Sequence, residues 1–153
     1  MIHLIKECSL KGEYYGWILY TAQERIRNRH YIELYQSACK KYGMSVILGI
    51  YEQQKQETQN WLTELVRQEK PAFVVNRTRD YQLAKALEAL DVRVYNHSQI
   101  AEIGNDKAKA YRYMEQQGIP IMPTVYDTVT VPEHYPVVVK SCDGHGGTEV
   151  FLI

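Results

Sequence analysis

The sequence predicts an α/β fold, in which a small open parallel sheet with flanking helices precedes the first helix and hairpin of a second domain. Short β-branched and aromatic runs alternate with helical apolar stripes at spacings of about 25 residues or fewer, as βαβ crossovers do. After residue 100 this alternation gives way to a helix, a proline-rich extended segment and a glycine-rich hairpin. We therefore predict two domains, residues 1–100 and 101–153.

Four strands are expected in the first domain. Each is a short apolar run bounded by polar or turn residues, the pattern of a buried strand. The runs are 14–20, 45–51, 72–75 and 92–95. The first 13 residues show no clear period, and we expect either an extra edge strand or a loose arm there.

Helices are expected between these strands, because apolar residues three and four apart mark one helical face. The three stripes are Tyr31, Leu34, Tyr35, Ala38 and Tyr42; then Trp61, Leu62, Leu65 and Val66; then Leu83, Ala84, Leu87 and Leu90. Gly43 follows the first stripe, where a left-handed residue commonly ends a helix. Pro71 stops the second stripe, and Asp80 is a suitable N-cap for the third.

The second domain begins with a helix that has clear start and stop signals. Asn105-Asp106-Lys107 opens this helix, and Gly118, followed by Pro120, closes it. Its inward face is expected to carry Ala108, Tyr111 and Met114. The prolines that follow keep the next segment extended.

The last stretch, residues 135–153, predicts a hairpin. Val137 to Val139 form a β-branched run that indicates a buried strand, Lys140 ends it, and Val150 to Ile153 form the return strand. The glycines between them let backbone amides point at an anion, and a lysine beside such a loop suits phosphate. On these residues alone, a plain tight turn with a solvated lysine remains an alternative.

Composition excludes several classes of function. The 18 basic and 18 acidic side chains give a formal net charge of zero, which argues against nucleic acid as a bulk electrostatic partner. The apolar runs are too short to span a bilayer, and no signal peptide is visible. Three cysteines without Cys-x-x-Cys spacing suggest neither a disulfide framework nor a zinc site. We expect a cytoplasmic protein without a membrane partner.

Arginines follow the third predicted strand, at the carboxyl end of the sheet where α/β domains bind ligands. Arg77 and Arg79 lie in the polar segment that ends at Asp80. Either arginine could bind a substrate carboxylate. Both could equally pair with Asp80 and cap local backbone, and the sequence leaves these alternatives open.

Four segments of the second domain, taken together, resemble the start of an ATP-grasp domain. The nearest likeness is to RimK-type and related carboxylate–amine ligases, and the preceding α/β unit resembles the smaller domain before the grasp. The segments, in order, are Asn105-Asp106-Lys107, residues 118–124, residues 135–140 and residues 144–150. Each segment alone is a weakly specific signal. The four segments in this order and at this spacing are a more specific one.

The resemblance implies roles for particular residues. Lys107 and Lys140 look like the two lysines that contact the ATP phosphates. The residues that look like the mobile loop over the triphosphate are Gly144, His145, Gly146, Gly147 and Thr148. The family uses ATP and Mg²⁺ to activate a carboxylate as an acyl phosphate, which an amine or another nucleophile then attacks. ATP and small carboxylate and amine substrates are therefore the expected partners.

The chain also departs from the family's pattern. Ser141 and Cys142 follow Lys140, where many members have a proline, and after the glycines only Glu149 offers a carboxylate. The resemblance places the adenine pocket and the metal ligands further downstream. We therefore expect an N-terminal fragment that is inactive alone and binds ATP weakly. The alternative is a non-catalytic α/β module that binds a small ligand or a partner.

Overall fold

A computed structural model describes residues 1–5, 14–53, 60–126, 134–144 and 149–153 of the chain. The chain divides into two compact units, Met1–Ala101 and Glu102–Ile153. Each unit is described by itself below. No helix in the described ranges is long and apolar enough to cross a membrane.

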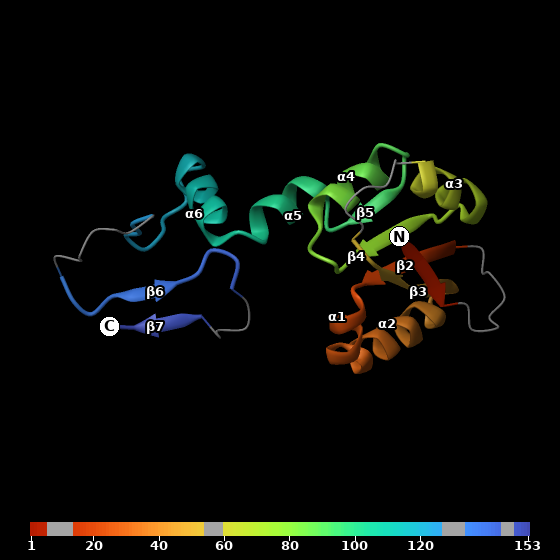
Figure 1. Cartoon of the computed structure of the whole chain (residues 1–153), viewed down its shortest axis with the longest axis horizontal. Helices are drawn as coiled ribbons and strands as arrows, with labels where there is room; N and C mark the ends of the chain where they lie inside the picture. The colour runs from red at the N-terminus through yellow and green to blue at the C-terminus, as the bar shows by residue number, and fades with distance from the viewer. Residues whose placement is uncertain (6–13, 54–59, 127–133, 145–148) are drawn as a thin grey trace. The chain divides into compact units, whose positions relative to one another are not determined.

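The first unit contains a five-stranded sheet with helices on both faces (Figure 1). The strands, in the order in which they lie side by side, are β1 (Ile2–Ile5), β3 (Met44–Tyr51), β2 (Tyr14–Tyr20), β4 (Phe73–Asn76) and β5 (Arg93–Tyr95). The four strands from β2 to β5 are parallel, as predicted. The sheet as a whole is mixed, because β1 pairs antiparallel with β3. For these first residues the sequence left open an extra edge strand or a loose arm, and the structure has an edge strand, in the antiparallel direction that is common at the edge of such sheets.

The central strand β2 is buried on both faces. Trp17, Ile18 and Leu19 are 0% exposed, and such a continuous apolar run is what a parallel strand covered by helices needs. Trp17 and Leu19 belong to the core on one face, and Ile18 belongs to the core on the other face. The sheet therefore has two cores that β2 joins.

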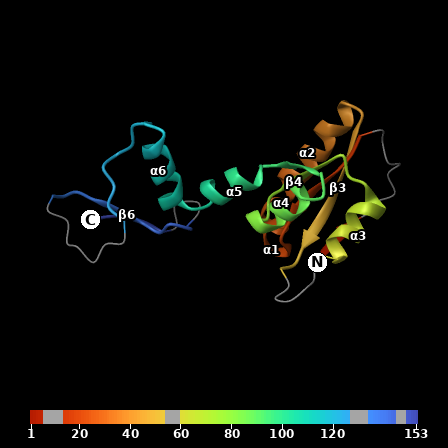
Figure 2. The same cartoon turned by 90° about the horizontal axis from the view of Figure 1, so that it is seen from above.

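Two pairs of helices cover the two faces of the sheet (Figures 1 and 2). The helices α1 (Ala22–Arg27) and α2 (Arg29–Lys41) lie on one face, where Ile32 of α2 packs with Ile18. The helices α3 (Asn60–Glu69) and α4 (Tyr81–Glu88) lie on the other face, where Leu62 and Leu87 pack with Trp17.

The predicted N-cap of α4 is confirmed. The Asp80 carboxylate accepts hydrogen bonds from the backbone N–H groups of Gln82 at 2.9 Å and Leu83 at 3.1 Å. These are two of the four N–H groups that a helix leaves unpaired at its start. The cap fixes where the polar segment after β4 turns into the helix.

The strand order places a topological switch point in this sheet. From β2 the chain adds β3 on one side, then crosses to the other side to add β4. Open α/β sheets bind ligands beyond the carboxyl ends of the strands at such a point. Here those ends are Tyr20 of β2 and Asn76 of β4, which Arg77 follows.

The second unit contains one complete helix and a two-stranded ribbon. The helix α6 (Lys107–Gln116) begins after Asp106, whose carboxylate accepts the backbone N–H of Lys109 at 3.0 Å. Gly118 follows with a φ of 69°, as expected of a left-handed residue after a helix end. A short helix that the sequence did not suggest, α5 (Ser98–Gly104), spans the boundary between the units.

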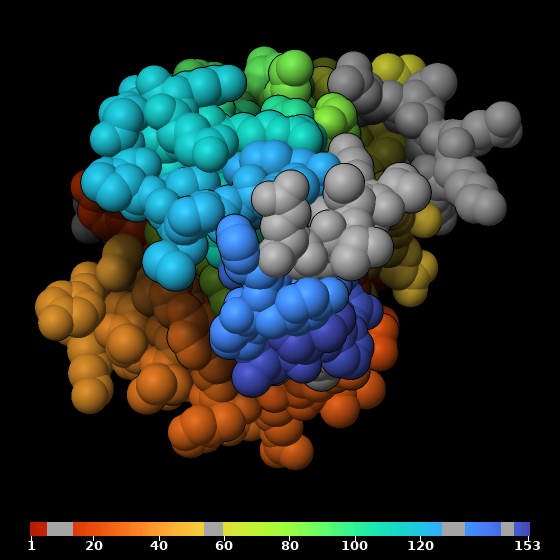
Figure 3. All heavy atoms as spheres, turned by 90° about the vertical axis from the view of Figure 1, so that its left-hand side faces the viewer, coloured from red at the N-terminus to blue at the C-terminus, as the bar shows by residue number. Residues whose placement is uncertain are grey.

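The predicted hairpin is present, and its predicted burial is wrong. Strands β6 (Val138–Lys140) and β7 (Val150–Leu152) pair antiparallel. Val138 and Val139 are 54% and 43% exposed, and Leu152 is 74% exposed. Figure 3 shows this ribbon in blue at the surface. A ribbon of two strands has no layer of its own to cover its faces, so β-branched residues predict the strand correctly without predicting its burial.

Candidate functional site

Lys107 lies in the first turn of α6 and binds the segment that follows β6. Its ammonium Nζ donates to the carbonyl oxygen of Ser141 at 3.0 Å and to that of Gly144. Its backbone N–H donates to the carbonyl oxygen of Cys142 at 2.8 Å. The N-terminus of α6 and the start of the glycine-rich loop therefore lie side by side.

Lys140 ends β6, and its side chain contacts the same helix. Its Nζ donates to the Tyr111 hydroxyl at 2.7 Å and lies 4.9 Å from the centre of that ring. Tyr111 is half-buried on α6, as are Ala108 and Met114, the other two residues of the predicted inward face. The structure thus brings both predicted lysines to α6, one at its start and one about a turn further along.

The start of the glycine-rich loop is held by hydrogen bonds. The Ser141 hydroxyl donates to the Glu149 carboxylate and accepts the backbone N–H of Gly144 at 2.7 Å. A Cβ at Gly144 would lie 2.2 Å from the Ser141 Oγ and 2.5 Å from the Glu149 Oε2. A side chain at this position would therefore have to displace the Ser141 and Glu149 side chains.

The remaining predicted loop residues lie outside the described ranges. These residues are His145, Gly146, Gly147 and Thr148. Their assignment to the ATP phosphates stays a prediction.

The two lysines keep hydrogen-bonding capacity for an anion. An ammonium group has three N–H donors. Described residues take two donors of Lys107 and one donor of Lys140. Neither lysine forms an ion pair with a carboxylate of the described ranges. This arrangement can place two positive charges and several N–H donors around a phosphate chain.

The described residues do not fit a magnesium site. Among them there is no group of three histidine, cysteine, aspartate or glutamate side chains that could hold a metal ion. Glu149 is tied to Ser141 by the hydrogen bond described above. A protein Mg²⁺ site uses carboxylates together with substrate phosphates, and we assign no metal ligand among the described residues.

A second cluster of side chains, the Tyr20–Arg77 cluster, lies at the carboxyl edge of the five-stranded sheet of the first unit. The backbone N–H of Arg77 donates to the Leu19 carbonyl at 2.9 Å, which ties the end of β4 to β2. Its guanidinium carbon lies 5.7 Å from the centre of the Tyr31 ring on α2. Arg77 forms no ion pair with Asp80, which instead caps α4 and accepts the Tyr51 hydroxyl at 2.8 Å.

Arg79 lies in the same loop as Arg77 and differs from it in backbone conformation. Its side chain is exposed, and its φ of 66° lies in the left-handed region, which non-glycine residues seldom adopt. Before it, the Asn76 side chain accepts the Thr78 N–H at 3.1 Å and donates to the Asp80 carbonyl at 2.9 Å. These bonds hold the loop in a fixed shape.

Tyr20 is a member of this cluster that the sequence did not single out. It is 1% exposed, and its hydroxyl has no hydrogen-bond partner of good geometry among the described residues. Burial raises the pKa of Tyr20, and the nearby Arg77 guanidinium acts against that rise. The apolar pattern of β2 predicted burial of Tyr20, but an unpaired hydroxyl depends on neighbours in space and leaves no signal in the sequence.

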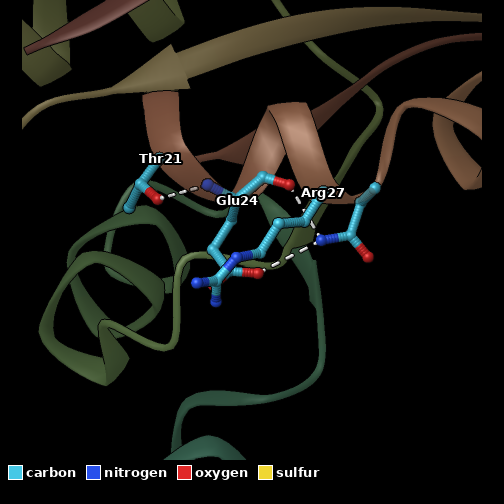
Figure 4. Close-up of polar contacts among 4 residues, drawn as sticks. Thr21, Glu24 and Arg27 are labelled. Carbon is cyan, nitrogen blue, oxygen red and sulfur yellow. Dashed lines mark hydrogen bonds and ion pairs between the residues drawn. The ribbon is translucent and has the colours of Figure 1, made fainter.

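Glu24 lies near Tyr20 and is held in place by local contacts (Figure 4). Its backbone N–H donates to the Thr21 hydroxyl oxygen at 3.3 Å, which caps α1. Its carboxylate accepts the Asn28 side-chain N–H at 3.1 Å and lies 3.5 Å from the Arg27 guanidinium. The Glu24 carboxylate is thus held at the edge of the cluster, where its charge acts on Tyr20.

Comparison with known proteins gives relatives without an assigned activity. No known protein-family model matches the chain. An 82-residue segment is 28% identical to a Mycoplasma pneumoniae protein described as uncharacterized protein MG011 homolog. An 81-residue segment is 25% identical to uncharacterized protein MG011 of Mycoplasma genitalium. Each match covers 53% of this chain and 28% of the relative, so the chain matches little more than a quarter of either protein.

Proposed function

We propose that this chain belongs to an ATP-dependent carboxylate–amine ligase of the ATP-grasp superfamily and supplies its first phosphate-binding elements. The observation that carries the proposal is the meeting of Lys107 and Lys140 at α6. They are separated by 33 positions of sequence (140 minus 107). Lys107 of α6 donates to the Ser141 carbonyl just after β6, and Lys140 of β6 donates to the Tyr111 hydroxyl of α6. Two cations beside a glycine-containing loop are suited to a triphosphate.

The contacts of Lys107 also suit this role. Its ammonium is fixed by the carbonyl groups of Ser141 and Gly144, so its position does not depend on a ligand. A donor that is already oriented loses little entropy when an anion binds. Lys140, aligned by Tyr111, offers a second oriented donor for the same phosphate chain.

The reaction proposed is phosphoryl transfer followed by acyl transfer. A substrate carboxylate oxygen attacks the γ-phosphorus of ATP, the bond to the β–γ bridging oxygen breaks, and ADP leaves. An amine then attacks the acyl carbon and displaces phosphate. In the first step the lysines stabilise charge on the phosphoryl oxygens, which is the main catalytic need of phosphoryl transfer. The proposed ligase uses Mg²⁺ with ATP, and because the described residues do not fit a magnesium site we assign the metal no step here.

The test is nucleotide turnover by the protein encoded by the complete reading frame. We expect ADP release that depends on a carboxylate substrate, tested with a panel of small carboxylates and amines. Lys107→Ala and Lys140→Ala should each lower the rate about tenfold or more, since a hydrogen bond to a charged group contributes about 1.5–3 kcal/mol. Lys109→Ala is the matched control, because Lys109 is exposed on the same helix and pairs with Glu102 at 3.4 Å. Wild-type turnover in both Lys107 and Lys140 variants would contradict the proposal.

The alternative, a non-catalytic ligand-binding module, rests on a different part of the molecule. It is favoured by the Tyr20–Arg77 cluster at the switch point of the first unit. A module of that kind would bind its ligand there and would be indifferent to ATP.

A further inference from the structure

We propose that the carboxyl edge of the first unit binds a small monocarboxylate between the Arg77 guanidinium and the Tyr20 hydroxyl. The proposal concerns a site of its own and does not depend on ATP binding by the second unit. It rests on the placement of these two side chains, on the buried hydroxyl and on the fixed charge of Glu24.

Tyr20 and Arg77 are placed together by the sheet. The last pair in the β2–β4 ladder is Leu19 with Asn76, so Tyr20 and Arg77 occupy the next position on neighbouring strands. Tyr20 packs in the core beneath α2, and the Arg77 guanidinium lies over Tyr31 of α2. Both side chains are therefore on the α2 side of the sheet, at the switch point where ligands of α/β domains bind.

The buried hydroxyl of Tyr20 needs an explanation. A buried polar group without a partner costs about 1–3 kcal/mol, and phenylalanine would fill the same space without that cost. Tyr20 is 1% exposed, and its hydroxyl is the one buried side-chain polar atom of the described ranges without a hydrogen bond of good geometry; Arg77 is the polar side chain nearby. A ligand oxygen that accepts this O–H would satisfy the hydroxyl.

Arg77 supplies the opposite charge. Its side chain is exposed at the edge of the cluster and is in no ion pair with a described carboxylate. The guanidinium carbon lies 5.7 Å from the centre of the Tyr31 ring, a cation–π contact that holds the side chain near α2. A guanidinium binds a carboxylate through two parallel hydrogen bonds.

Glu24 favours a ligand with a single negative charge. The charge on Glu24 acts on Tyr20, and its side chain is 25% exposed and held by Asn28 and Arg27. Because Glu24 stays in place, a second negative charge on the ligand would be repelled by it. A monocarboxylate fits this balance better than a phosphate dianion.

The experiment is a titration of the 153-residue chain with sodium acetate, followed by amide shifts in heteronuclear NMR spectra at constant ionic strength. We expect saturable shifts at Tyr20, Arg77 and their strand neighbours. Arg77→Gln should weaken the apparent Kd about tenfold or more, and Tyr20→Phe about threefold or more. Arg67→Gln is the matched control, because Arg67 makes the same charge change on α3, where its side chain is 78% exposed. It should leave the Kd unchanged.

Two further readouts separate a binding role from a structural one. Tyr20→Phe should unfold at the same temperature as the wild type or a higher one, because the hydroxyl it removes has no partner. Sodium phosphate at pH 8 should give a Kd at least threefold weaker than acetate. A lower melting temperature for Tyr20→Phe would show that the hydroxyl has a structural partner and would overturn the proposal. Linear, unsaturable shifts, or equal loss in the Arg67 control, would overturn it as well.

Discussion

The two units of this chain are built on different amounts of buried surface. The first unit has apolar cores on both faces of its sheet, with Trp17, Ile18 and Leu19 completely buried between them. In the second unit no residue of the described ranges is buried, and its ribbon exposes Phe151 and Leu152. Hydrophobic burial is the dominant favourable term in folding. The first unit is thus stabilised mainly by its apolar core. In the second unit, hydrogen bonds such as those at Lys107 and Asp106 contribute a larger share of the stability.

The largest effect should come from truncating the core of the first unit. Trp17→Ala should lower the free energy of unfolding by about 3–5 kcal/mol, because it removes a fully buried indole and leaves a cavity. Phe151→Ala is the matched change in the second unit, where the ring is 59% exposed. It should cost no more than about 0.5 kcal/mol. Urea denaturation followed by tryptophan fluorescence and circular dichroism measures both, and equal costs would remove the difference between the units.

Alkaline pH should destabilise the first unit by the next largest amount. The Tyr15 hydroxyl accepts Trp17 Nε1–H at 3.0 Å and donates to Glu69 at 3.2 Å, and burial raises its pKa to about 12. The folded chain therefore keeps the phenol proton at a pH where the unfolded chain, with a tyrosine pKa of about 10, releases it. This stability is fully present below pH 10 and is lost as pH rises towards 12.

The loss from Tyr15 should be on the order of 2 kcal/mol between pH 9 and pH 12, since one pKa unit corresponds to about 1.4 kcal/mol. Urea midpoints across that range measure it. Tyr15→Phe is less stable at pH 8 because it loses two hydrogen bonds, yet its stability should fall less steeply with pH. An identical pH slope in the variant would show that Tyr15 does not carry the effect.

The helix caps compare the units at matched positions. Asp80 caps α4 and also accepts the Tyr51 hydroxyl, whereas Asp106 caps α6 through the single N–H of Lys109. Asp80→Ala should therefore cost about 2 kcal/mol and Asp106→Ala about 1 kcal/mol. Chemical denaturation measures the first, and hydrogen exchange of the α6 amides measures the second. A larger cost at Asp106 would mean that the second unit depends on its cap more than its contacts indicate.

Sequence patterns predicted the elements of the fold better than their surroundings. The run of Tyr14–Tyr20 and the Asp80 cap are local signals, and both appear in the structure as expected. The direction of β1 and the exposure of Val138 depend on what packs beside them, which no local pattern encodes. Periodicity thus predicted the four parallel strands and the helices α2, α3 and α4, whereas β1 lies in a segment without a clear period.

In the candidate site, too, the sequence predicted residues but not their contacts in space. Lys107 and Lys140 were paired as phosphate contacts by the resemblance to the start of an ATP-grasp domain, but their contacts with the Gly144 carbonyl and with Tyr111 needed coordinates. Tyr20 was predicted only as part of an apolar strand. Its position beside Arg77 follows from the pairing of β2 with β4, two strands whose facing positions lie 57 residues apart (76 minus 19).

The proposed role of the two lysines is tested most directly by comparing ATP with adenosine. The measurement is calorimetric affinity of both ligands for the protein encoded by the complete reading frame and for its Lys107→Ala and Lys140→Ala variants. If the lysines bind phosphate, each variant should lose about tenfold or more in affinity for ATP and keep its affinity for adenosine. Unchanged ATP affinity in both variants, or an equal loss for adenosine, would contradict the assignment.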